Sequence, residues 1–201
     1  MTDWENRYQL GEMPWEKGQA APPLVELLSA AEPVVWGAGP VLVPGCGFGH
    51  DVRILAAHGL TVVGLDLSPT AVERARAFHQ VHGETYELGN FMDPDWLAGR
   101  QFSAIWEHTC FCAIDPADRS RYAKAAASCL PDDGLLAGVF FLTPFDPGAE
   151  KPGPPHGVTL AELEAEFSPY FKKVRGWVPR TAYPGREGRE WLGIFRKHSQ
   201  P

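Results

Sequence analysis

The chain has 201 residues, of which 44% are hydrophobic and 21% are charged, and its formal net charge is −7. This composition fits one globular domain with a sizeable core, and the negative charge argues against a nucleic-acid partner. The longest strongly apolar stretch, residues 135–142, is far too short for a membrane helix of roughly 20 residues, and the first residues lack the pattern of a signal peptide.

Short apolar runs alternate along the chain with segments that carry helix start and stop signals. Strands are predicted, in chain order, at 41–43, 61–67, 85–88, 102–108, 135–142, 171–178 and 190–197. Helices are predicted at 51–58, from 69 to about 82, from 116 to about 130, and at 159–167. Ser68 is expected to cap the second of these helices, and Glu162 is available for a capping box in the last.

This alternation predicts an α/β fold with a doubly wound, mostly parallel sheet that is covered on both faces. The last two strands are predicted to form an antiparallel pair at the sheet edge, and only 147–155 reads as a long irregular insertion. Sheets of this kind bind ligands beyond the carboxyl ends of their strands, beside the first strand. The candidate ligand site therefore lies directly after residue 43.

The four cysteines form no CxxC pair, which predicts neither a disulfide framework nor a metal site. Cys46, Cys110 and Cys129 are expected to be small core residues with reduced thiols. A cytoplasmic protein is the simplest interpretation.

Three glycines on alternate positions, in "GCGFG" at 45–49, follow the first strand. A dinucleotide site favours G-x-G-x-x-G, but His50 stands where its third glycine would be. Asp66 ends the second strand, where a carboxylate can accept hydrogen bonds from ribose hydroxyls; it can also be a simple turn residue. After the third strand, Asn90 and Phe91 could meet an adenine ring, although Phe91 could equally belong to the core.

A tight glycine loop, a ribose acid and an adenine-side pair resemble the class I S-adenosylmethionine (SAM)-dependent methyltransferases, which have a Rossmann-like seven-stranded sheet. The segment "WENRYQLGEMPWEKGQAAPPL" at 4–24 resembles more narrowly the thiopurine S-methyltransferase family, which includes thiol, halide and thiocyanate methyltransferases. Four further stretches match in order: "VPGCGFGHD", "VVGLDLSPTAVERA", "TCFCAIDPADRSRYA" and "PGPPHGVTLAELE". The resemblance covers nearly the whole chain and implies a single domain over 1–201.

The resemblance implies SAM as cofactor, S-adenosylhomocysteine as its product, and a lid formed by residues 1–30. The alternative for the aromatic residues of this segment is a hydrophobic staple that pins the terminus. The residues implied to contact the cofactor are Gly45 and Gly47 at the methionine part, Asp66 at the ribose, Asn90 and Phe91 at the adenine, Thr109 near the sulfonium, and Trp4, Tyr8 and Trp15 in the lid.

Two arginines are candidates for contact with the methyl acceptor. Arg119 matches an arginine placed near the acceptor pocket in the thiopurine branch; alternatively it pairs with Asp115 or Asp118 on a helix surface. Arg189 lies in the basic region 172–198 and could meet an anionic ligand, although most of these charges are expected to be solvated.

Methyl transfer to a thiolate or halide needs no base, because a dry aromatic pocket and alignment of the reacting atoms suffice. Trp4, Trp15, Trp106 and Phe111 could supply such a pocket. His108 and His156 stand where tyrosines are usual in the halide and thiol branch, and both are expected in loops that overhang the pocket. One or both could accept a proton from a neutral acceptor, although a lone histidine is more often structural. Glu107 is the other ionisable candidate, although it could instead bind only backbone or a lid residue.

The leading interpretation is a methyltransferase that acts on a small soft nucleophile: a thiol, thiopurine, hydrosulfide, halide or thiocyanate. The alternatives are an O- or N-methyltransferase that uses His108 and His156 as bases, and a non-catalytic SAM-binding regulatory protein. An NAD-dependent oxidoreductase is the weakest alternative, because the glycine spacing fails at His50. The expected partner is a small-molecule acceptor, with no nucleic acid or membrane, and the expected state is a monomer or a weak homodimer.

Overall fold

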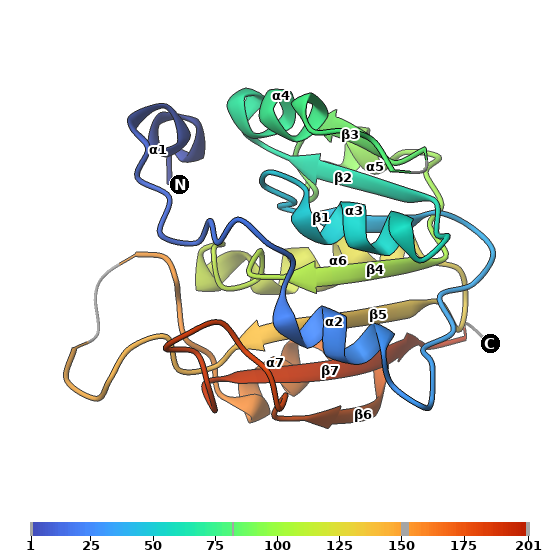
Figure 1. Ribbon diagram of the computed structural model, residues 1–201. Helices are drawn as coiled ribbons and strands as arrows, with labels where there is room; N and C mark the ends of the chain where they lie inside the picture. Colours follow the sequence, from blue (N-terminus) through green and yellow to red (C-terminus); the bar gives the residue numbers. More distant parts are fainter. Residues whose placement is uncertain (1, 82, 150–152, 200–201) are drawn as a thin grey trace.

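The computed structural model describes residues 2–81, 83–149 and 153–199. Seven strands form one sheet in the order β3-β2-β1-β4-β5-β7-β6. The strands are β1 (Val41–Pro44), β2 (Val62–Asp66), β3 (Thr85–Leu88), β4 (Ala104–His108), β5 (Leu135–Phe141), β6 (Phe171–Trp177) and β7 (Glu190–Lys197). The five strands from β3 to β5 pair in parallel, whereas β7 runs antiparallel to both β5 and β6, as its reversed arrow in Figure 1 shows. The predicted fold class is confirmed. Of the two antiparallel strands at this end of the sheet, β7 lies next to β5 and β6 forms the edge.

Helices cover both faces of this sheet (Figure 1). The helices are α1 (Trp4–Leu10), α2 (Pro22–Leu28), α3 (His50–Ala57), α4 (Pro69–Ala77), α5 (Pro94–Leu97), a 3-10 turn η1 (Pro116–Asp118), α6 (Arg119–Ser128) and α7 (Leu160–Phe167). Helices α2, α3 and α4 pack on one face, and α5, α6 and α7 pack on the other.

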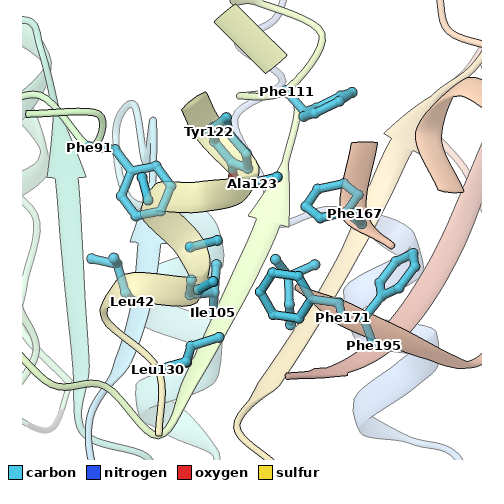
Figure 2. Packing of buried hydrophobic residues seen from close by; sticks show 14 of the residues in the cluster. Leu42, Phe91, Ile105, Phe111, Tyr122, Ala123, Leu130, Phe167, Phe171 and Phe195 are labelled. Carbon is cyan, nitrogen blue, oxygen red and sulfur yellow. The ribbon is translucent and has the colours of Figure 1, made fainter. Parts of the chain in front are cut away.

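Strand periodicity builds the two cores. Alternate residues of β4 point to opposite faces, so Ile105 joins the core under α6 while Ala104 and Trp106 join the core under α2 and α3. Figure 2 shows the first of these cores, in which Phe167 of α7 and Phe195 of β7 pack with ring centroids 5.3 Å apart. Strand β5 is buried along its whole length because both faces of the sheet are covered. Its sequence is therefore a continuous apolar run rather than an alternating one.

Two helix starts form as predicted. The Ser68 hydroxyl accepts a hydrogen bond from the Ala71 amide at the start of α4, and Thr159 and Glu162 make the expected capping box at α7. The predicted end of α4 near residue 82 is wrong, because the helix ends at Ala77 and Phe78 is extended (ψ 151°). Residues 76–81 are all exposed, so a longer helix would bury no apolar face.

Candidate active site

A cavity of about 320 Å³ opens at the carboxyl ends of the parallel strands. Residues that follow β1, β2, β3 and β4 form its floor, and α1 with the loop after it forms its roof. Figure 1 shows α1 beyond the arrowheads of these strands. The predicted site residues that line it are Trp4, Tyr8, Trp15, Gly45, Asp66, Asn90, Phe91 and Thr109.

The glycine loop after β1 brings bare backbone to this cavity at Gly45, whereas Gly47, the other glycine predicted to contact the cofactor, is not among the described residues that line it. Gly45 and Gly47 have φ angles of 63° and 53°, a region that L side chains rarely adopt. A Cβ atom on Gly45 would lie 3.1 Å from the Cys110 thiol sulfur, and one on Gly47 would lie 3.2 Å from the Tyr8 hydroxyl. Glycine is therefore favoured at both positions for two reasons: the backbone conformation is strained for other residues, and a side chain would crowd the neighbouring Cys110 or Tyr8.

Asp66 connects the glycine loop to the next helix. Its Oδ2 accepts a hydrogen bond from the Gly47 amide at 2.8 Å, and its Oδ1 accepts one from the Ser68 amide at 2.9 Å. Burial raises the pKa of this carboxyl above its ordinary value, although the amides of Ser68, Gly47 and Leu67 act in the opposite direction. Each carboxylate oxygen can accept a second hydrogen bond, so the side chain retains acceptor capacity toward the cavity.

The three aromatic residues of the N-terminal segment meet as predicted. The Trp15 Nε1–H donates to the Tyr8 hydroxyl at 3.3 Å, and the ring centroids of Trp4 and Trp15 are 5.3 Å apart. Tyr8 also packs on Phe48 of the glycine loop, with centroids 5.5 Å apart. The roof is thus pinned to the site by its own packing, as a staple would be, while it lines the cavity.

Glu5 fastens the roof to the N-terminus of α4. Its carboxylate accepts hydrogen bonds from the Ser68 hydroxyl (2.5 Å), the Thr70 hydroxyl (2.6 Å) and the Thr70 amide (3.1 Å). Donation by Ser68 and Thr70 lowers the pKa of Glu5 to about 2. Since this pKa lies below its ordinary value of 4.5, the contact is fully present above pH 4.5 and is lost only as the pH falls through 2.

Replacing Glu5 with alanine is expected to loosen the roof without unfolding the sheet. Trypsin should then cleave after Arg7 and Lys17 roughly three to ten times faster, and SAM should bind more weakly by a similar factor. Mass spectrometry of a digestion time course measures the cleavage. The matched control is Glu12→Ala, an exposed glutamate of the same segment. Equal cleavage rates in the two variants would contradict the role of Glu5.

Thr109 is the first residue after β4 and has a φ of 64°. A β-branched residue in this region carries strain of about 1–3 kcal/mol. Such strain persists only where the surrounding structure fixes the backbone, and it concentrates at functional sites. The position of Thr109 in the cavity wall is consistent with the predicted role of this loop.

The predicted catalytic residues of β4 are not among the described residues that line the cavity: Glu107 is buried and His108 is partly buried. His108 is the last residue of the strand, and its Nδ1 pairs with Asp51 Oδ2 at 3.0 Å while its buried Nε2 has no described hydrogen-bond partner. Asp51 also accepts from Trp106 Nε1 at 2.8 Å and from the Ala21 amide at 2.7 Å. His108 was expected in a loop over the cavity; strand alternation instead turns it toward α3.

Glu107 points to the opposite face of the sheet. It accepts hydrogen bonds from the Phe111 amide at 2.8 Å and from the buried Tyr122 hydroxyl. Complete burial raises the pKa of Glu107 to about 7, although these two donors act to lower it. Neither Glu107 nor His108 is among the described residues that line the cavity. Trp106 and Phe111, expected in the pocket, are buried core residues instead.

The three remaining candidates also lie outside the cavity wall. His156 borders a neighbouring hollow that shares Pro155 with the cavity, and its amide donates to the Cys112 carbonyl at 2.7 Å. Arg119 is buried and donates to the carbonyls of His156 (3.3 Å) and Gly157 (2.9 Å), so it pairs with no helix-surface aspartate. Arg189 forms an ion pair with Asp146, which satisfies its charge at the surface.

Several residues of the cavity wall were not predicted from the sequence as site residues. They are Arg7, Lys17, Cys110, Cys112, Tyr122, Phe141 and Arg186. Arg186 stands on the loop before β7, where it pairs with the buried Glu190 at 3.0 Å and lies over the Phe141 ring. The sequence signal that could have identified it is the basic region 172–198, within which a different arginine was selected.

In the part of the chain that the structure describes, no helix is long and apolar enough to cross a membrane. In the same residues, no group of three or more His, Cys, Asp or Glu side chains could hold a metal ion.

The reversed seventh strand and a cavity over a glycine loop define the class I SAM-dependent methyltransferase fold. A solved structure with this fold is the 1,6-didemethyltoxoflavin-N1-methyltransferase of Burkholderia thailandensis, determined with bound 1,6-didemethyltoxoflavin and S-adenosylhomocysteine. It superposes with a TM-score of 0.72 at 19% identity, over 98% of this chain and 86% of that one.

The family model described as Thiopurine S-methyltransferase (TPMT) matches residues 1–178. The chain therefore belongs to the thiopurine S-methyltransferase family and is a SAM-dependent methyltransferase. A probable thiol methyltransferase 2 of Arabidopsis thaliana is 33% identical, over 98% of this chain and 85% of the relative. Thiocyanate methyltransferase 1 of the same plant is also 33% identical, over 96% and 84%. The predicted family, cofactor and enzyme class are confirmed, which sets aside the oxidoreductase and the non-catalytic alternatives.

Proposed function

We propose that this enzyme transfers the methyl group of SAM to a small soft nucleophile, such as a thiol, thiopurine, hydrosulfide, halide or thiocyanate. The observation that carries this proposal is that no histidine or glutamate, which could serve as a general base, is among the described residues of the cavity wall. Its single carboxylate, Asp66, is held by backbone amides. An acceptor that arrives as an anion needs no such base.

The residues present fit the cofactor. SAM supplies an electrophilic methyl group when it is bound. The backbone at Gly45 and Gly47 is bare enough for close approach of its methionine part, and Asp66 has acceptor capacity for ribose hydroxyls. Asn90 and Phe91 follow β3 in the same wall and would take the adenine. The side-chain carbonyl of Asn90 already accepts a hydrogen bond from the Met92 amide at 2.9 Å, which leaves the side-chain amino group free to donate to a ligand.

The rest of the wall suits an anionic acceptor. Aromatic rings from Trp4, Trp15 and Phe141 exclude water, which strengthens the attraction between opposite charges in the cavity. Two cations, Arg7 and Lys17, line it against one acid, Asp66, and a third, Arg186, is paired with Glu190. This excess of positive charge raises the local concentration of anions. The relatives named above are a probable thiol methyltransferase and a thiocyanate methyltransferase, whose acceptors ionise or are already anionic.

The O- or N-methyltransferase alternative receives less support. It requires a base beside the acceptor, whereas His108 is paired with Asp51 and His156 borders the neighbouring hollow. A catalytic role for either histidine stays a prediction from the sequence. So do the cytoplasmic location, the single domain with a lid over residues 1–30, the expected acceptor contacts of Arg119 and Arg189, and the monomeric or weakly dimeric state.

The pH dependence of turnover tests the proposed function. If the acceptor arrives as an anion, the thiolate is the species that reacts, and kcat/KM should rise with pH until the thiol itself is ionised. Two thiols whose pKa values differ by about 2 units should give inflections about 2 pH units apart. The measurement is methylated product formed from SAM, quantified between pH 6 and 10 for an aromatic and an aliphatic thiol.

His156→Gln should leave both inflections in place. A common inflection for the two thiols that moves in this variant would show instead that the enzyme supplies the base. Absence of product from every thiol, from iodide and from thiocyanate, with phenols or amines methylated, would replace the proposal by the O- or N-methyltransferase alternative.

A further inference from the structure

Arg7 is a cation fixed in the roof of the cavity. Its guanidinium carbon lies 4.5 Å from the centroid of the Trp15 ring and 5.5 Å from that of Trp4. Stacking on two indoles orients a guanidinium without using its five N–H donors. The residue lines the cavity, so these donors are held at the place where ligands would bind.

The charge of Arg7 has no counter-ion in the part of the chain that is described. No described carboxylate forms an ion pair with it. Three acidic side chains of this segment are engaged elsewhere: Asp3 by the Asn6 amide, Glu5 by Ser68 and Thr70, and Glu16 by His50 at 2.9 Å. Arg186, by contrast, is already neutralised by Glu190.

Arg7 lines the same cavity as Gly45 of the glycine loop. Lys17 follows Trp15 closely in the chain and lines the same cavity. Two cations of the roof therefore face the space between the strand ends and the aromatic rings.

We propose that Arg7, assisted by Lys17, forms an anion subsite that binds a carboxylate group of a ligand in the cavity. The inference rests on the proposed function in that the ligand is SAM or its acceptor. Two sources carry the required chemistry: the carboxylate of the cofactor's amino-acid part, and a carboxylate carried by the acceptor. The guanidinium fork suits a carboxylate in either case, because it can donate two parallel hydrogen bonds.

The test compares Arg7→Gln with Arg74→Gln. Arg74 is a matched control: its guanidinium also stacks on an aromatic ring near the roof, 5.3 Å from the centroid of Phe48, but it is exposed and is not among the described residues lining the cavity. Calorimetry measures the binding of S-adenosylhomocysteine, which has the carboxylate, and of 5′-methylthioadenosine, which lacks it. Steady-state kinetics measures KM for 3-mercaptopropionate, which has a carboxylate, and for 1-propanethiol, which lacks one.

Loss of one charge-assisted contact should weaken a ligand about tenfold or more. A loss for S-adenosylhomocysteine but not for methylthioadenosine in Arg7→Gln would assign the subsite to the cofactor carboxylate. A raised KM for 3-mercaptopropionate alone would assign it to the acceptor. Binding is measured without turnover, so the subsite can be established even if no thiol is methylated.

Two results would overturn the proposal. One is an Arg7→Gln variant whose dissociation constants and KM values all match those of Arg74→Gln. The other is an Arg7→Gln variant in which ligands with and without the carboxylate bind more weakly by the same factor, because that would mean Arg7 only packs the roof.

Discussion

Replacing Asp66 with asparagine is expected to weaken SAM binding about 100-fold or more. The carboxylate has acceptor capacity for two ribose hydroxyls, and charge-assisted hydrogen bonds contribute about 1.5–3 kcal/mol each. Asparagine keeps one acceptor oxygen, and the Gly47 and Ser68 amides now compete for it. A loss of about 3 kcal/mol corresponds to the expected factor. Calorimetric titration with SAM gives the dissociation constant directly.

The same replacement also acts through the glycine loop. Because Asp66 holds the Gly47 amide, its loss lets the loop relax away from the geometry that the cofactor needs. Glu87→Gln is the matched control: Glu87 lies on the adjacent strand, pairs with Arg100 at 2.9 Å and is not among the described residues of the cavity wall. Thermal unfolding confirms that both variants are folded at the titration temperature. Binding within threefold of the unchanged protein would refute a ribose role for Asp66.

The features of the site that sequence reasoning located correctly depend on local backbone geometry. A glycine loop after a buried strand and an acid at the end of the next strand are fixed by the parallel sheet, because carboxyl ends of adjacent parallel strands meet at one edge. The structure therefore places Gly45, Asp66 and Asn90 around one cavity, as their spacing predicts.

The direction of the side chains at the end of β4 was mispredicted, although the sequence contains the signal. Side chains alternate along a strand, so His108 must share a face with Trp106 and Ala104, which belong to the core under α3. Glu107 must then face α6. A loop over the pocket was expected for His108, whereas the period of two turns His108 toward α3 and Glu107 into the buried core.

The loops gave no comparable signal. Arg186 and Arg189 are three residues apart in an irregular segment, and only the folded loop decides that one lines the cavity while the other pairs with Asp146. Arg7 was overlooked for a related reason. Its neighbours in sequence are the aromatic residues of the roof, and only the folded structure shows that two indole rings hold its guanidinium at the cavity.

Glu107→Gln is expected to change how stability depends on pH. The unfolded carboxyl titrates near 4.5, whereas the buried Glu107 has a pKa of about 7. Between these values the native protein retains a proton that the unfolded chain releases, so the free energy of unfolding falls as the pH rises and is constant above about 7. The shift corresponds to a loss of about 3 kcal/mol from Glu107 across this window.

Glutamine is neutral at every pH and has nearly the same shape. Its carbonyl can accept from the Phe111 amide, and its amino group can donate to the Tyr122 oxygen. The free energy of unfolding of Glu107→Gln, measured relative to that of the unchanged protein, should therefore rise by about 3 kcal/mol between pH 4.5 and pH 8. Urea unfolding at pH 5 and pH 8 should capture most of this change, and an equal difference at both pH values would contradict it.

Tyr122→Phe supplies the second test of the same pair. The Tyr122 hydroxyl donates to the Glu107 carboxylate and so lowers its pKa. Without that donor the ionised form is less stable, and the pKa of Glu107 must rise further above 7. The fall in stability should then continue beyond pH 7 in Tyr122→Phe, where the unchanged protein has already levelled off. If both proteins level off at the same pH, the hydroxyl does not stabilise the ionised carboxylate, and the pair is held by packing alone.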